Sequence, residues 1–169
     1  MRVVVWAAAV VALGGCASSE GEPEQAESSP PATLAAPSDP GSSPEELALE
    51  AYRNMWGAVA EGSHEGAVEH PDLEEYASGQ ALELVTAMLQ GVEATGEPVL
   101  SPDALSAEPE ADPVRVSIED CIDSSEWLVG EGADDSPQGE KRRPVEATVL
   151  DEGDGWRVDD LWLGEYGSC

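Results

Sequence analysis

The sequence predicts an α+β domain in which N-terminal helices pack on a curved antiparallel sheet. Two patterns predict this fold class. Apolar residues recur at helical spacing between residues 45 and 89, and apolar residues alternate with polar ones between residues 114 and 163. Helices followed by strands are typical of helices gathered on one face of an antiparallel sheet. The length of 169 residues allows one such domain with accessory segments.

The first predicted helix runs from about residue 45 to residue 61. Ser43 suits the N-cap, Pro44 suits the first helical position, and Glu46 completes a capping box. The apolar residues behind this cap recur at helical spacing: Leu49, Tyr52, Trp56 and Val59. We interpret this stripe mainly as core.

Two further helices are predicted before the strands. Asp72 follows Pro71 and caps a short helix that ends at Tyr76. A longer helix begins near Gly79, and its apolar face is formed by three residues at helical spacing: Leu82, Val85 and Leu89.

The remaining elements are predicted strands. Val114, Val116, Ile118 and Ile122 alternate with polar residues, which indicates a strand with one buried face. A short strand is expected at 126–129. The alternating set at 145–149 and the apolar residues at 156–163 flank the turn sequence 151–155, so they should form an antiparallel hairpin.

The first sixteen residues have the pattern of an export signal. Arg2 precedes an apolar run of eleven residues, Val3 to Leu13, which is shorter than the roughly 20 residues that a membrane-spanning helix needs. The sequence Leu13-Gly14-Gly15-Cys16 resembles the bacterial lipobox, in which the cysteine is diacylated and the preceding peptide is removed. Residues 1–15 are therefore expected to be a signal peptide and Cys16 the lipidation site. An ordinary secretory signal is the alternative.

Residues 16–44 are expected to be a disordered linker between the lipid and the domain at 45–169. Residues 17–44 contain six Pro, seven Ser, five acids and no base, and such a composition cannot offset the cost of ordering the backbone. An interaction tail or a site of O-glycosylation is the alternative. Two acyl chains give durable anchoring, so the expected location is the extracytoplasmic face of the cell membrane.

Charge and cysteine content restrict the partners and the redox setting. The formal net charge of −29 opposes binding to phosphate backbones, so nucleic acid is excluded as an expected partner. Two cysteines, Cys121 and Cys169, remain once Cys16 is acylated, and in an oxidising compartment they are expected to form a disulfide. A redox-active or metal-binding pair is the alternative, although no CxxC spacing supports it.

Four segments resemble secreted or lipid-anchored actinobacterial proteins of the nuclear-transport-factor-2-like superfamily. They are HPDLEEYASGQAL (70–82), GEPVLSP (96–102), DCIDSS (120–125) and GWRV (155–158), followed by Cys169. We take the resemblance to extend over the chain from about residue 45 onward. The resemblance implies a cone-shaped fold with a cavity. It does not imply one function, because members include enzymes, ligand binders and proteins with neither role.

Three residues are candidates for acid–base chemistry. Asp120 shares the parity of the inward-facing residues of its strand, where burial would raise the pKa of its carboxyl group. The interpretation we favour is instead that the strand ends or bulges there, so that Asp120 lies in a turn. His70 and Tyr76 are further candidates. The sequence contains no nucleophile, phosphate-loop, dinucleotide or metalloprotease motif, and no metal or cofactor is expected.

The favoured functional interpretation is a non-enzymatic binding or protein-interaction module. Its partner would be an unidentified protein or a small apolar ligand. The residues expected to line the cavity are Tyr52, Trp56, Leu82, Val116 and Ile118. The alternatives are an isomerase- or dehydratase-like enzyme that uses Asp120 with Tyr76 or His70, and a passive component of the cell envelope.

Overall fold

A computed structural model describes residues 41–90, 93–129 and 141–169. The expected signal peptide, Cys16 and all but the last few residues of the expected linker lie outside the described residues. Within those ranges, no helix combines the length and the apolar character needed to cross a membrane.

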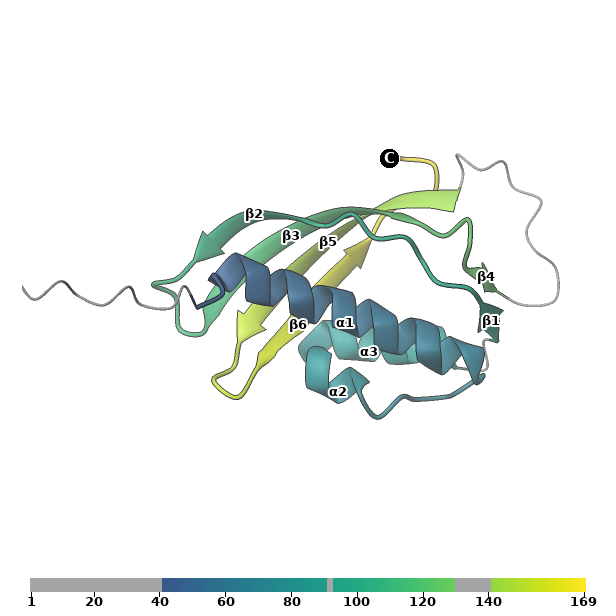
Figure 1. The fold of residues 1–169 in the computed structure, drawn as a ribbon, viewed down its shortest axis with the longest axis horizontal. Coiled ribbons are helices and arrows are strands. Elements are labelled where there is room, and N and C mark those ends of the chain that lie inside the picture. Colours follow the sequence, from purple (N-terminus) through teal and green to yellow (C-terminus); the bar gives the residue numbers. More distant parts are fainter. Residues whose placement is uncertain (1–40, 91–92, 130–140) are drawn as a thin grey trace, which may run out of the picture. The chain divides into compact units, whose positions relative to one another are not determined.

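The described chain is α+β, as the sequence predicts. Three helices come first, and six strands follow: α1 (Pro44–His64), α2 (Leu73–Tyr76), α3 (Gly79–Leu89), β1 (Ala94–Thr95), β2 (Asp103–Glu108), β3 (Val114–Asp123), β4 (Leu128–Val129), β5 (Arg142–Asp151) and β6 (Trp156–Leu163). The main sheet is antiparallel with the order β2-β3-β5-β6, while β1 and β4 form a separate pair. The helices lie on one side of the main sheet (Figure 1).

The predicted cap of α1 is confirmed. The hydroxyl of Ser43 accepts a hydrogen bond of 3.3 Å from the backbone N–H of Glu46, and the Glu46 carboxylate accepts one of 2.9 Å from the N–H of Ser43. The helix continues almost one turn beyond its predicted end, to His64. There the His64 ring is hydrogen-bonded to the carbonyl of Gly96 at 2.7 Å, which joins the end of α1 to the chain just after β1.

Three strands differ from the sequence-based expectation, and one of them, the two-residue β1, was not predicted. The expected strand at 126–129 is only two residues long and pairs with β1. The sequence analysis missed β2, whose residues DALSAE include no β-branched side chain and show little alternation. Its pairing with β3 shifts register at a bulge between Ala104 and Ser106. Pairing with a strongly patterned neighbour therefore forms this edge strand despite its weak intrinsic preference.

The core lies between the helices and the inner face of the sheet. Its largest fully buried side chains come from both layers: Tyr52, Met55, Trp56, Val59, Leu73, Val85, Leu89, Val116, Ile118, Ile122, Val145 and Leu161. Trp56 packs edge to face against Tyr52 and Trp127, with ring centroids 6.5 and 6.3 Å apart. Trp127 lies just before β4. Its indole N–H donates a hydrogen bond of 3.1 Å to the buried hydroxyl of Ser63, so its polar atom is satisfied.

The outer edge of β6 is covered by Ser78, just before α3, and by the first turn of α3. The N–H of Ser78 donates to the carbonyl of Val158 at 2.8 Å, and the side-chain oxygen of Gln80 accepts from the N–H of Leu161 at 2.8 Å. These bonds occupy edge groups of β6 that would otherwise be free to pair with another chain.

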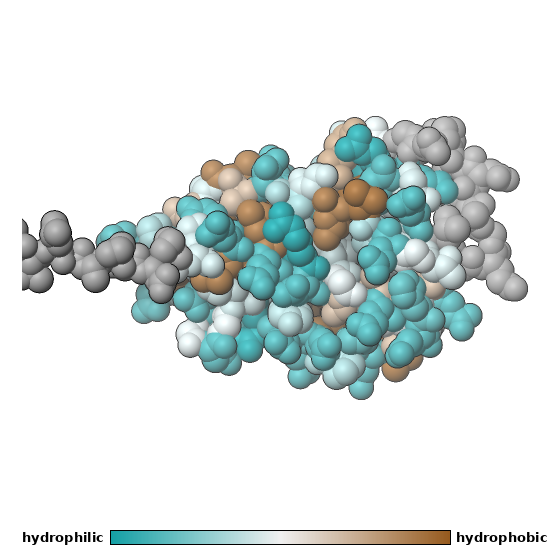
Figure 2. Space-filling model, viewed as in Figure 1, coloured by the Kyte–Doolittle hydropathy of each residue, from teal (hydrophilic) through white to brown (hydrophobic). Residues whose placement is uncertain are grey.

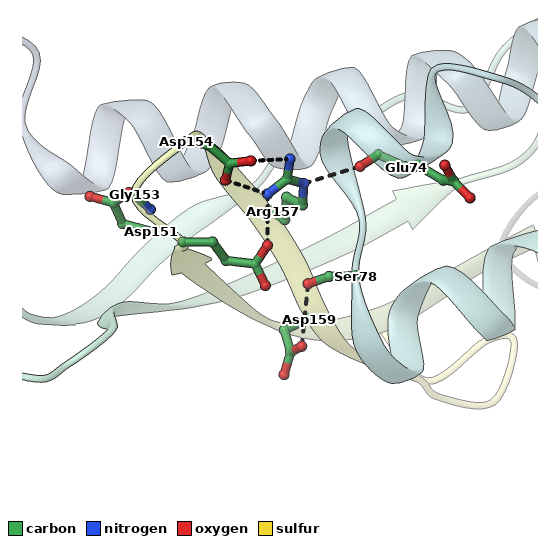
Figure 3. Close-up of polar contacts among 8 residues, drawn as sticks. Glu74, Ser78, Asp151, Gly153, Asp154, Arg157 and Asp159 are labelled. Carbon is green, nitrogen blue, oxygen red and sulfur yellow. Dashed lines mark hydrogen bonds and ion pairs between the residues drawn. The ribbon is translucent and has the colours of Figure 1, made fainter. Parts of the chain in front are cut away.

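Arg157 joins the β5–β6 turn to α2 (Figure 3). Its guanidinium donates to Glu152 at 2.7 Å, to Asp154 at 2.8 Å and to the backbone carbonyl of Glu74 at 3.0 Å. The hydrogen bonds from Arg157 lower the pKa of the Asp154 carboxyl group. The turn itself is tightened by a 2.9 Å bond from the N–H of Gly153 to Asp151.

The surface seen in Figure 2 is mainly hydrophilic, with separate small groups of hydrophobic residues. Scattered apolar residues of this kind are ordinary on a protein surface.

The predicted disulfide between Cys121 and Cys169 is confirmed. Their Cα atoms lie 6.1 Å apart, and the bridge joins β3 to the segment after β6. That segment also lies beside the start of β5, because the N–H of Gly164 donates to Pro144 and the N–H of Gly167 donates to Arg142. Arg143 stacks over the ring of Tyr166 at 4.9 Å.

Removal of the disulfide should destabilise the domain. The bridged residues are 48 positions apart, and chain entropy predicts that replacing both cysteines by alanine lowers the free energy of unfolding by about 4 kcal/mol. Urea denaturation would measure this difference. The wild-type protein under reducing conditions is the control and should match the double variant, while a loss below about 1 kcal/mol would contradict the expected role.

Candidate functional site

Asp120 is the one buried carboxylate among the described residues 41–90, 93–129 and 141–169. Strand β3 pairs with β5 without interruption from Val114 to Asp123, so its alternation continues through Asp120 and directs that side chain toward the helices. Only 6% of Asp120 is exposed. The favoured expectation that the strand ends or bulges at Asp120 was therefore wrong, and the turn begins only after Asp123. The long pairing with β5 is the reason, because it holds the strand in register.

Two donors satisfy the Asp120 carboxylate. The buried hydroxyl of Tyr52 on α1 donates to one oxygen at 3.1 Å. The backbone N–H of Ser101 donates to the other at 2.9 Å. Ser101 is held in place because the nearby Val99 exchanges two backbone hydrogen bonds with Asp123, at 2.9 and 3.0 Å. The carboxylate thus joins α1, the central strand and the segment that leads into β2.

Burial raises the pKa of the Asp120 carboxyl group above its ordinary value of 3.8. The hydrogen bonds from Ser101 and Tyr52 oppose this rise, because they favour the ionised form, and the positive charge of Arg53 acts in the same direction. Burial and the nearby Asp120 carboxylate also raise the pKa of the Tyr52 hydroxyl well above its usual range. Tyr52 therefore remains a hydrogen-bond donor.

The candidate acid–base residues lie in different places. His70 lines a groove of about 510 Å³ with Glu69, Glu74 and Leu82. Its ring nitrogen accepts a 3.3 Å hydrogen bond from the N–H of Asp72, which is a local loop contact.

Tyr76 lines a separate hollow of about 220 Å³ on the α1 side. The negative charge of Glu75 raises the pKa of the Tyr76 hydroxyl. Asp120 lines neither this hollow nor the groove of His70, so the structure does not assemble the three residues into one site.

Four of the five residues expected to line a cavity belong to the packed core. Tyr52, Trp56, Val116 and Ile118 are at most 1% exposed. This burial places their side chains inside the core and not on the wall of a cavity open to solvent. Leu82 is partly buried and lines the groove that contains His70.

The opposite face of the sheet carries the features that the sequence analysis missed. We call it the outer face, and it carries Asp103, Leu105, Glu119, Glu146, Asp160 and Trp162. All six side chains are exposed. None of the described helices covers this face. Alternation alone indicates that Glu119, Glu146 and Trp162 point away from the core, but only the strand register shows that they are neighbours.

Two shallow hollows lie on the outer face. One, of about 200 Å³, is lined by residues that include Leu105, Glu119, Glu146 and Trp162. The second, of about 330 Å³, shares Glu119 and Glu146 and extends to the disulfide. Asp120 and its partner Val145 border the second hollow, but the pleat directs their side chains to the inner face, so they contribute backbone to its floor.

The acidic side chains do not form a metal centre in the described part of the chain. Across residues 41–90, 93–129 and 141–169, no three Asp, Glu, His or Cys side chains are grouped closely enough to hold a metal ion.

Comparison with known proteins gives no family assignment. No family model matches the chain, and no curated protein matches it. Among solved structures, the intermembrane space region of the chloroplast protein ARC6 aligns with a TM-score of 0.43 and 13% sequence identity. The alignment covers 74% of this chain and 99% of that one. A similarity at this level carries no conclusion about fold or function.

Replacing Tyr52 by phenylalanine should destabilise the protein without a change in packing volume. The substitution leaves a buried carboxylate oxygen without its donor, which should cost about 1.5–3 kcal/mol in the free energy of unfolding. Urea denaturation would measure the loss. Tyr166→Phe is the matched control, because this tyrosine is exposed, and it should change stability by no more than about 0.5 kcal/mol. Equal effects of the two variants would show that the buried hydrogen bond contributes nothing.

The raised pKa of Asp120 predicts a pH-dependent difference between the wild type and Asp120→Asn. A carboxyl group with a higher pKa in the folded state binds protons more tightly there, so its contribution to stability is full below 3.8 and is lost as pH rises through the folded value. The free energy of unfolding of the wild type should therefore fall relative to that of the variant across this window. Denaturation at a series of pH values would test it, and a relative rise would mean that the pKa is lowered.

Proposed function

We propose that this protein is a membrane-anchored extracytoplasmic lipoprotein whose folded domain is a non-enzymatic protein-interaction module. The anchor is supported by the apolar run and the Leu13-Gly14-Gly15-Cys16 sequence. Export is consistent with a disulfide in the domain, since such bridges persist in oxidising compartments.

One observation carries the choice of an interaction module over an enzyme. The only inward-facing candidate carboxylate, Asp120, is almost fully buried among the described residues, and both of its oxygens already accept hydrogen bonds. A general base must reach the proton that it removes. The oxygens of this carboxylate are instead hydrogen-bonded to Tyr52 and Ser101 inside the domain. Leu105 and Trp162, two of the five exposed large hydrophobic residues of the described chain, lie instead on the outer face beside exposed carboxylates, where a partner has access.

We further propose a relationship to the cone-shaped nuclear-transport-factor-2-like fold. Its support is the order of helices before an antiparallel sheet, together with the four segments that resemble that superfamily. In this chain the place of the cone's cavity would be taken by Tyr52 and Trp56, which agrees with a role that needs no enclosed ligand site.

Loss of Cys16 should release the protein from the membrane. In a bacterial host that processes lipoproteins, the wild type should incorporate labelled palmitate and sediment with membranes, because acyl chains are needed for durable anchoring. Cys16→Ser should do neither. The control is the double variant Cys121→Ala and Cys169→Ala, which removes the two other cysteines without touching the anchor and should still be labelled. Recovery of the wild type from the medium with an unmodified Cys16 thiol would refute the proposed anchor.

A further inference from the structure

The outer face carries a row of carboxylates across three neighbouring strands. In the sheet register, Asp103 on β2 lies opposite Glu119 on β3, Glu119 lies opposite Glu146 on β5, and Glu146 lies opposite Trp162 on β6. All of these side chains are exposed. Asp160 adds a further carboxylate beside them and lines the same hollow as Trp162.

This arrangement is unfavourable in the absence of a partner. Neighbouring strands are about 4.8 Å apart, and like charges directly opposite one another destabilise a sheet. Within the described residues, Asp103, Glu119 and Glu146 form no ion pair that would relieve the repulsion.

None of the described arginines of the sheet lies opposite Asp103, Glu119 or Glu146 in the register. Arg115 lies opposite Glu108 and Leu150, further along the strands. Arg142 lies opposite Asp123, Arg143 stacks on Tyr166, and Arg157 pairs with residues of the β5–β6 turn. The negative charge of the row is therefore available to a cationic partner.

Apolar side chains adjoin the row. Trp162 is 52% exposed and Leu105 is 57% exposed, and both line the hollow that Glu119 and Glu146 also line. An exposed tryptophan next to carboxylates suits arginine in particular, because a guanidinium can stack on the indole while it binds a carboxylate. Tryptophan and arginine are also the residues most enriched at the energetic centres of protein interfaces.

We propose that the outer face binds a basic, arginine-containing segment of a partner protein. The inference rests on the proposed function and adds the chemistry of the partner. The negative charge of the outer face argues against the other occupants. A second copy of the chain carries a net charge of −29, and residues 17–44 carry five acids and no base. Nucleic acids and anionic lipids are also negatively charged and would be repelled. One carboxylate on each of three strands spreads the charge over about 10 Å, which suits several cations along a segment.

The test uses the full-length chain in a non-ionic detergent and a fluorescent peptide of alternating arginine and glycine. Fluorescence anisotropy would give its affinity. A peptide in which citrulline replaces arginine keeps the shape without the charge and should bind at least about tenfold more weakly. Asp103→Asn, Glu119→Gln and Glu146→Gln, combined in one variant, should weaken binding of the arginine peptide by a similar factor.

The matched control removes the same charge from the helices. The control variant combines Glu50→Gln, Glu61→Gln and Glu83→Gln, at exposed positions of α1 and α3. Because it also loses three carboxylates, it has the same net charge as the outer-face variant. It should retain affinity within about twofold, the range expected of a long-range effect between screened charges. Trp162→Ala should weaken the arginine peptide more than a lysine peptide, because arginine stacks better on an indole.

Two outcomes would overturn the inference. Equal loss of affinity in the two charge variants would mean that the peptide follows net charge and not the outer face. Failure of the wild type to distinguish the arginine peptide from the citrulline peptide would mean that the face has no preference for cations. Neither outcome would affect the proposed anchor, which membrane fractionation of Cys16→Ser tests separately.

Discussion

The hydrogen bond between the Tyr52 hydroxyl and the Asp120 carboxylate allows the first helix to pack on the central strand. Strand β3 directs every second side chain toward α1, and one of these is an aspartate. A buried carboxylate without hydrogen-bond donors would destabilise the fold. Helix α1 supplies the hydroxyl of Tyr52, and the segment that leads into β2 supplies the N–H of Ser101. The aromatic cluster and the entry into β2 are arranged around this polar contact.

The fold class was predictable because its strongest elements carry their own patterns. The capping box at Ser43, the helical stripe of α1 and the alternation in β3, β5 and β6 all agree with the structure. Strand β2 was not predictable from its own sequence, because its residues have a weak strand preference and become a strand by pairing with β3. Local sequence thus identifies the elements that organise the fold, but not those that depend on a neighbour.

The candidate site was less predictable than the fold. The parity of Asp120 correctly indicated an inward side chain, but a single aspartate near a turn-like sequence favoured the opposite interpretation. Its partners Tyr52 and Ser101 lie 68 and 19 positions away and become neighbours only through the packing of α1 and the pairing around Val99. The row of Asp103, Glu119 and Glu146 depends in the same way on a register that spans three strands.

The disulfide also has a topological consequence. Cys121 and Cys169 close a covalent ring that contains the end of β3 and all of β5 and β6. A protease that cuts one peptide bond between these cysteines opens the ring but releases no fragment, because both pieces remain attached through sulfur. After such a cut Glu119 and Trp162 can lie on different pieces, but the disulfide still joins the two pieces covalently. Outside a cell, such a domain would survive a single cleavage as one molecule.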